Sequence, residues 1–165
     1  MSAHRPFQIG VLTLSDKGSQ GQRVDESGPV VEELLAPVGE VVHVAILPDD
    51  IASISTLLIA WTDQGNLDLI VTTGGTGLSP RDVTPQATLQ VIDYEIPGMA
   101  EAMRTQSLRK TPHAMVSRAV VGVRKQTMII NLPGSPKAAR ENLETLLPAL
   151  PHALAKLTGD PSDCA

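Results

Sequence analysis

A glycine-rich segment is the strongest chemical signal in the sequence. Residues 73–77 read TGGTG and directly follow an apolar run at residues 67–72. Ligands of open α/β sheets bind at the carboxyl ends of strands, where glycines let backbone N–H groups point toward an anion. A tight turn would explain the glycine pair alone, but hydroxyl donors and a cation surround it, so we predict a phosphate-binding loop. Its candidate residues are Thr73, Gly74, Gly75, Thr76, Gly77, Arg81 and Thr84.

Three aspartates follow predicted strands. Asp16 comes after the first apolar run, Asp49 after the second and Asp82 shortly after the third. Because the carboxyl ends of parallel strands share one edge of a sheet, the three carboxylates are expected to face one crevice. Mg2+ binds one or two such carboxylates together with substrate phosphates. With a formal net charge of −5, a divalent cation of this kind is the simplest way for the chain to offset its repulsion of a phosphorylated ligand.

Each of these acids has a structural alternative, because aspartate is a common helix cap and turn residue. For Asp50, which precedes a predicted helix, the cap is the favoured interpretation. For Asp16, the cap and the ligand are equal alternatives. Asn131 ends a further strand before Pro133 and Gly134, where an amide and a helix N-terminus can bind an anion. Taken alone, that segment is better explained as an ordinary turn.

Apolar strands alternate with helical segments along the chain, which is typical of an α/β fold. The polar and glycine-rich residues 16–28 are a predicted loop. The predicted strands are residues 7–15, 40–47, 67–72, 119–123 and 127–131, of which the last two form a hairpin. The predicted helices begin at Pro29 and at residues 51, 85, 98, 136 and 148, and Ser135 is the expected N-cap of the fifth.

The bulk composition limits the class of protein. A length of 165 residues, 42% of them hydrophobic and 19% charged, suits one globular domain over residues 1–165 with its core at about 7–160. No apolar run approaches the ~20 residues that span a bilayer, and the first residues lack a secretory signal, so we predict a cytoplasmic protein with no membrane partner. The acidic charge and the shortage of aromatic residues argue against nucleic-acid binding. The single cysteine, Cys164, is expected to be a bystander.

Several strings occur together in a characteristic order. They are LSD at 14–16, PD at 48–49, TGGTG at 73–77, PRDVTPQAT at 80–88, SR at 117–118 and NLPG at 131–134. In combination they resemble the MogA/MoaB family of molybdenum cofactor biosynthesis, which includes the G domain of gephyrin. The resemblance runs from about residue 7 to residue 160. Within the family, the chain is most similar to the molybdopterin adenylyltransferase branch, because Ser107 lies ten residues before Ser117. The family often has Glu at the position of Asp50 and Arg or Thr at that of Lys17, and both departures are mild.

The resemblance implies a three-layer α/β fold with a mostly parallel mixed sheet, and a homotrimer. It implies transfer of AMP from Mg-ATP to the terminal phosphate of molybdopterin, release of pyrophosphate, and delivery of the product to a MoeA-type molybdenum insertase. Asp49 is then the expected Mg2+ ligand and forms the catalytic pair with Asp82. The other expected contacts to pterin or nucleotide are Ser15, Asp16, Ser107, Ser117, Arg118, Asn131, Pro133 and Gly134.

Two other functions stay open from the sequence. A MoaB-like paralogue in molybdenum or tungsten cofactor biosynthesis would share the glycine loop and the acids. A non-catalytic molybdopterin-binding scaffold would not need a carboxylate that organises a metal, so Asp49 argues against it. His113 lies in a loop near the predicted site, and a substrate contact is the less favoured interpretation of this residue.

Overall fold

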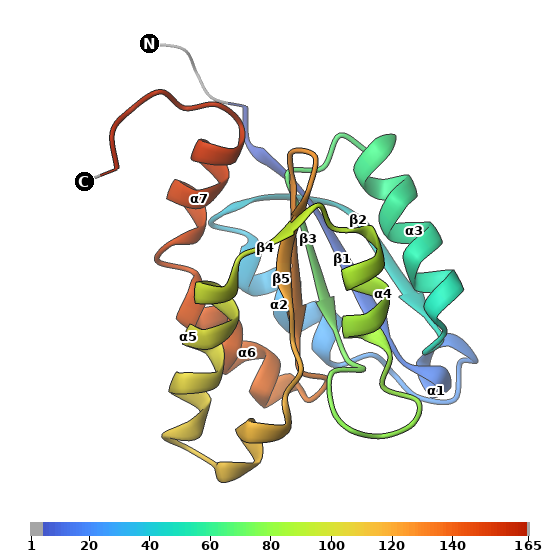
Figure 1. The fold of residues 1–165 in the computed structure, drawn as a ribbon. Coiled ribbons are helices and arrows are strands. Elements are labelled where there is room, and N and C mark those ends of the chain that lie inside the picture. The colour runs from blue at the N-terminus through green and yellow to red at the C-terminus, as the bar shows by residue number, and fades with distance from the viewer. Residues whose placement is uncertain (1–4, 165) are drawn as a thin grey trace.

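A six-stranded sheet forms the middle layer of the protein, as the computed structural model shows for residues 5–164 (Figure 1). The prediction of a single domain also includes residues 1–4 and 165, which lie outside the described part. The strands are β1 (Phe7–Leu14), β2 (Gly39–Leu47), β3 (Leu69–Thr73), β4 (Tyr94–Glu95), β5 (Val121–Arg124) and β6 (Thr127–Leu132). Their order is β2-β1-β3-β6-β5-β4. The first four strands of this order run parallel, whereas β5 and β4 pair antiparallel with their neighbours.

Helices cover both faces of the sheet (Figure 1). They are α1 (Asp16–Ser19), α2 (Ser27–Leu35), α3 (Ile51–Asp63), α4 (Thr84–Val91), α5 (Pro97–Leu108), the 3-10 helix η1 (Pro112–Val116), α6 (Pro136–Leu146) and α7 (Leu150–Leu157). One apolar cluster joins α2, α5, α6 and α7 to the sheet, and the other joins α3 and α4 to the opposite face. Because successive side chains of a strand alternate between faces, Val11 enters the first cluster and Leu12 the second. The predicted three-layer α/β fold is confirmed.

The boundaries of several elements differ from the prediction. Helix α2 begins at Ser27 and not at Pro29, because the carboxylate of Asp25 accepts the Gly28 N–H at 3.0 Å and so supports an earlier first turn. The predicted loop at 16–28 contains the short helix α1. Strand β4 was not among the predicted strands. It forms because the chain becomes extended after Val91, the last residue of α4, and pairs antiparallel with β5.

Two other local predictions, the β5–β6 hairpin and the Ser135 cap, are confirmed. Strands β5 and β6 form the expected antiparallel hairpin, with Lys125 in the turn at a φ of 55°. Ser135 caps α6, since its hydroxyl accepts the Ala138 N–H. Cys164 is free and exposed. In the described part of the chain, no helix is both long enough and apolar enough to cross a membrane.

Asn131 is fully buried in β6 and holds three elements together. Its Nδ2 donates to the hydroxyls of Thr72 at 3.1 Å and Thr88 at 2.9 Å, and its Oδ1 accepts the Val120 N–H at 3.2 Å. These bonds connect β6 to β3, to α4 and to the segment before β5. The amide that the sequence suggested for the nucleotide side is therefore used inside the fold.

We expect Asn131→Ala to lower the free energy of unfolding by about 1–3 kcal/mol, because it leaves the buried Val120 N–H without its acceptor. Urea denaturation measures this change. Gln106→Ala, which removes an exposed amide from α5, is the matched control and is expected to alter stability by less than about 0.5 kcal/mol. Equal stabilities for the two variants would contradict the assigned role.

Candidate active site

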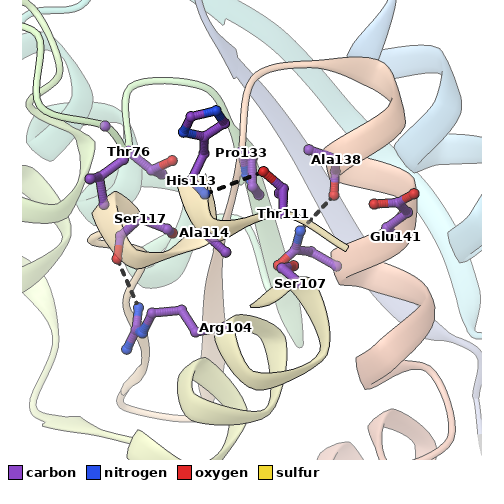
Figure 2. A pocket seen from close by; sticks show the side chains of 13 residues that line it. Thr76, Arg104, Ser107, Thr111, His113, Ala114, Ser117, Pro133, Ala138 and Glu141 are labelled. Atoms are coloured by element: carbon purple, nitrogen blue, oxygen red, sulfur yellow. Dashed lines mark hydrogen bonds between the residues drawn. The ribbon is translucent and has the colours of Figure 1, made fainter. Parts of the chain in front are cut away.

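Two neighbouring cavities lie at the carboxyl ends of the parallel strands. The larger has a volume of about 890 Å3 and the smaller about 240 Å3. The glycine loop separates them, since Gly74 and Gly75 line the larger cavity whereas Thr76 and Gly77 line the smaller. The predicted residues in the larger cavity are Ser15, Asp16, Asp49, Thr73, Gly74, Gly75, Asp82 and Gly134. Those in the smaller cavity are Thr76, Gly77, Ser107, Ser117 and Pro133, and Figure 2 shows this side of the loop.

The glycine loop adopts a conformation that requires glycine. Gly74 and Gly75 have φ angles of 106° and 71°, which side-chain-bearing residues rarely adopt. The buried Thr84 holds the bend, since its hydroxyl donates to the Gly74 carbonyl at 2.9 Å and its N–H to the Gly75 carbonyl at 3.1 Å. A Cβ at Gly75 would lie 3.0 Å from Oδ1 of Asp49. The loop backbone and this carboxylate are therefore in direct proximity.

Asp16 and Asp49 connect the ends of β1 and β2 reciprocally. The Asp16 N–H donates to Oδ2 of Asp49 at 3.2 Å, and the Asp49 N–H donates to Oδ1 of Asp16 at 3.0 Å. Arg81 completes the arrangement with two hydrogen bonds of 2.9 Å to the Asp16 carboxylate. The hydrogen bond from Arg81, followed by that from the Asp49 N–H, lowers the pKa of Asp16. Asp16 therefore stays ionised, and it fixes the backbone that carries Asp49.

Oδ1 of Asp49 is buried and has no hydrogen-bond partner among the described residues. Burial raises the pKa of Asp49, and the nearby charge of Asp16 raises it further. A buried polar atom without a partner costs free energy, and a bound cation would remove that cost. No group of three or more His, Cys, Asp or Glu side chains among residues 5–164 is placed to hold a metal. The donor set thus fits Mg2+, which takes one or two protein carboxylates and completes its shell with phosphates and water.

The neighbouring acids divide into a cavity residue and a cap. Asp82 lines the larger cavity, and its Oδ2 accepts the Ser79 N–H at 3.0 Å. Asp50 caps α3, since its Oδ2 accepts the Ser53 N–H at 2.8 Å and the Ser53 hydroxyl at 2.7 Å. The Ser53 hydroxyl and then its N–H lower the pKa of Asp50. The favoured interpretation of Asp50 as a helix cap is confirmed.

Four predicted contacts lie outside the lining of both cavities: Arg81, Thr84, Arg118 and Asn131. Arg118 holds the outer part of the loop. Its Nε donates to the Gly77 carbonyl at 2.8 Å and its Nη2 to the Asp82 carbonyl at 2.7 Å. The structure therefore places Arg118 beside the backbone of the site, where it positions the loop.

Sequence reasoning missed several lining residues. The larger cavity also contains Lys17, Arg23, Asp25 and Ser27, and the Ser27 hydroxyl donates to the Gly134 carbonyl. For Asp25 and Ser27, the available signal in the sequence was that they lie directly before Gly28 and Pro29, at the start of a predicted helix. The smaller cavity also contains Arg104, Thr111, Ala138, Glu141 and Asn142, together with His113, for which a substrate contact was the less favoured prediction. The spacing of Ala138, Glu141 and Asn142 at i, i+3 and i+4 could have indicated one helix face.

Comparisons with known proteins agree with this geometry. Residues 10–152 match the family described as "Probable molybdopterin binding domain". The chain is 42% identical to a molybdopterin adenylyltransferase of Helicobacter pylori, over 93% of this chain and 89% of that protein. It is 44% identical to gephyrin of Dictyostelium discoideum over 93% of this chain, but it spans only 23% of that longer protein.

A solved structure agrees closely with the fold. The molybdopterin biosynthesis enzyme MoaB of Thermus thermophilus superposes with a TM-score of 0.88 at 53% identity, covering 95% of this chain and 99% of that one. The match of the family model spans both cavities and the loop between them. The chain belongs to the molybdopterin-binding domain family of molybdenum cofactor biosynthesis.

Proposed function

We propose that this protein is a molybdopterin adenylyltransferase, which transfers AMP from Mg-ATP to the terminal phosphate of molybdopterin and releases pyrophosphate. The observation that carries the proposal is the unpartnered, buried Oδ1 of Asp49 beside the glycine loop, where the two cavities meet. Relatives named molybdopterin adenylyltransferase, 42–43% identical to this chain, support it.

The two cavities suit two substrates that must meet at a phosphate. The larger holds the acids and has room for a nucleotide, and the smaller, more apolar one suits a flat heterocycle. The starts of α2 and α6 border the larger cavity through Ser27 and Pro136. Helix N-termini favour anions, so both would attract the phosphates of ATP.

The residues of the chain act by positioning and by charge. The rigid glycine loop would hold the attacking phosphate of molybdopterin in line with the α-phosphorus of ATP, which lowers the entropic barrier. Asp49 would hold Mg2+ and Asp82 would add a second polar contact, at one end of the larger cavity. When bound, Mg2+ supplies positive charge that offsets the charge of the leaving pyrophosphate. Arg81 and Arg118 keep the backbone of this region in place.

The same proposal includes the surroundings of the enzyme. We place it in the cytoplasm as a homotrimer that hands adenylated molybdopterin to a MoeA-type molybdenum insertase. These features rest on the family resemblance of the sequence. The exclusion of nucleic acid as a partner rests on the net charge of −5.

The purified chain, incubated with molybdopterin, ATP and MgCl2, is expected to form adenylated molybdopterin and an equal amount of pyrophosphate. Mass spectrometry detects the first product, and a coupled phosphate assay the second. Excess EDTA should stop both. Binding of molybdopterin without product formation would refute the transferase and favour a scaffold.

A MoaB-type role in molybdenum or tungsten cofactor biosynthesis is the second candidate. The 53% identity to a MoaB structure favours it, and a tungsten cofactor synthesizing MoaB of Pyrococcus furiosus is 35% identical. The proposed transfer chemistry is the same in both cases. Deleting the gene and then assaying the molybdenum-dependent and the tungsten-dependent enzymes of the cell would distinguish the two roles.

A further inference from the structure

The smaller cavity has the lining of a site for a flat ring with one polar edge (Figure 2). Pro133, Ala114, Val116 and Ala138 provide apolar surface, and the cavity holds about 240 Å3. Glu141 is its one acidic lining residue within the described chain. A carboxylate in a mostly apolar ring site accepts N–H groups from the edge of the ring. A ring bound in this cavity is therefore expected to donate an N–H to Glu141.

We propose that Glu141 recognises the 2-amino-4-oxo pyrimidine edge of the pterin through hydrogen bonds and thereby determines which ring system the enzyme binds. The proposal rests on the proposed function, because it assigns the ring of molybdopterin to the smaller cavity. Glu141 would accept the N3–H and one N–H of the 2-amino group through its two oxygens. Paired bonds to an ionised carboxylate are stronger than neutral hydrogen bonds and fix the orientation of the ring.

The fold holds Glu141 in place for this role. The side chain stands on α6 one turn after Ala138, and Figure 2 shows it across the cavity from Thr76 and Ser117. The Lys110 ammonium forms an ion pair with its Oε1 at 3.3 Å. The Glu141 side chain is 24% exposed and that of Lys110 is 53% exposed, so the acid is the inner member of the pair. Lys110, the more exposed partner, therefore helps to fix the direction of the carboxylate.

Three of the neighbouring polar side chains, Asn142, Ser107 and Arg104, already form hydrogen bonds within the protein. Asn142 donates from Nδ2 to the Ala138 carbonyl at 2.8 Å, and its Oδ1 accepts the Ser107 hydroxyl at 3.3 Å. Arg104 donates through Nη1 to the Ala119 carbonyl at 2.8 Å. Glu141 is then the one carboxylate acceptor among the described residues that line the cavity. In a ring that carries a carbonyl in place of the 2-amino group, the carbonyl oxygen would face and repel a carboxylate oxygen of Glu141. Such a ring should bind more weakly.

Two simple fluorescent rings test the assignment without any transfer of AMP. Pterin carries the 2-amino group, and lumazine carries a carbonyl at the same carbon. We expect the wild-type chain to bind pterin at least about tenfold more tightly than lumazine, a difference of about 1.4 kcal/mol. Glu141→Gln should weaken pterin binding and remove most of this preference. Glu144→Gln changes an exposed acid on the same helix and should leave the preference unchanged.

The titrations also separate the recognition role from a structural one. If Glu141→Gln lowers the melting temperature but keeps the wild-type ratio of pterin to lumazine affinity, Glu141 is only an ion-pair residue and the proposal is wrong. A wild-type chain that does not prefer pterin also refutes it. Formation of adenylated molybdopterin by a chain with no such preference would refute the ring contact alone. A Glu141-dependent preference without transfer would refute the transferase alone.

Discussion

Asp49→Asn is expected to reduce AMP transfer by at least about a hundredfold, the scale of effect seen when one charge-stabilising group is removed from an active site. Asparagine keeps the size of the side chain, and its amide oxygen can still accept the Asp16 N–H that Oδ2 accepts now. The substitution removes the negative charge at the buried Oδ1 that would hold Mg2+. Product formation under saturating ATP measures the loss, and pterin binding should stay near the wild-type value.

The same substitution is expected to stabilise the chain when no metal or nucleotide is present. Burial raises the pKa of Asp49 in the folded protein above its ordinary value near 4. Ionisation above the raised pKa therefore costs folding free energy, and the cost disappears as the pH falls through that pKa. At neutral pH, the melting temperature of Asp49→Asn should exceed that of the wild type by a few degrees. The difference should shrink toward pH 4.

Asp50→Asn is the matched control for both effects. Asp50 is adjacent in sequence, but it caps α3 through Ser53, and asparagine is an equally good cap. We expect near wild-type transfer for this variant. Added Mg2+ with ATP should raise the melting temperature of the wild type and of Asp50→Asn, but not that of Asp49→Asn. Normal turnover by Asp49→Asn would show that this carboxylate does not organise the metal.

The sequence predicted the location of the site because it depends on strand ends. Apolar runs show where buried strands stop, and parallel strands stop at one edge of the sheet. Asp16, Asp49 and Asp82 therefore line one cavity, as their positions after three strands predicted. The loop was predicted from its place directly after a strand and from the cation and hydroxyl donors around it. The structure adds that Gly74 and Gly75 have positive φ angles.

The sequence could not predict where individual polar side chains point. Arg118 and Asn131 match the family motifs, yet Arg118 donates to loop carbonyls and Asn131 donates inside the core. These directions depend on tertiary neighbours, such as Thr88 on α4, that local pattern does not specify. Glu141 was missed for the same reason, because its place in the cavity follows from how α6 packs beside α5 and η1. The two-residue strand β4 was also not predictable from local pattern, because it exists only through its antiparallel pairing with β5.

Gly75→Ala is expected to abolish transfer as fully as the loss of Asp49, and also to destabilise the fold. At a φ of 71°, alanine is strained, which costs about 1–3 kcal/mol at such a position. The new Cβ would also collide with the Thr84 hydroxyl, which holds the Gly74 carbonyl, and would lie 3.0 Å from Oδ1 of Asp49. The methyl group thus displaces the loop and blocks the oxygen that the metal needs. Urea denaturation and the transfer assay measure the two losses separately.

Gly98→Ala provides the comparison that isolates the loop from a general effect of replacing glycine. Gly98 lies in the first turn of α5, and a Cβ there would meet no atom within 4 Å. Alanine favours the helix, so this variant should be as stable as the wild type or up to about 1 kcal/mol more stable, with unchanged transfer.

Combining Gly75→Ala with Thr84→Ala removes the collision with the hydroxyl but neither the positive φ nor the contact with Asp49, so activity should stay lost. Full activity of folded Gly75→Ala would mean that the approach of the loop to Asp49 is unnecessary for transfer, because the methyl group can only be accommodated if the two separate.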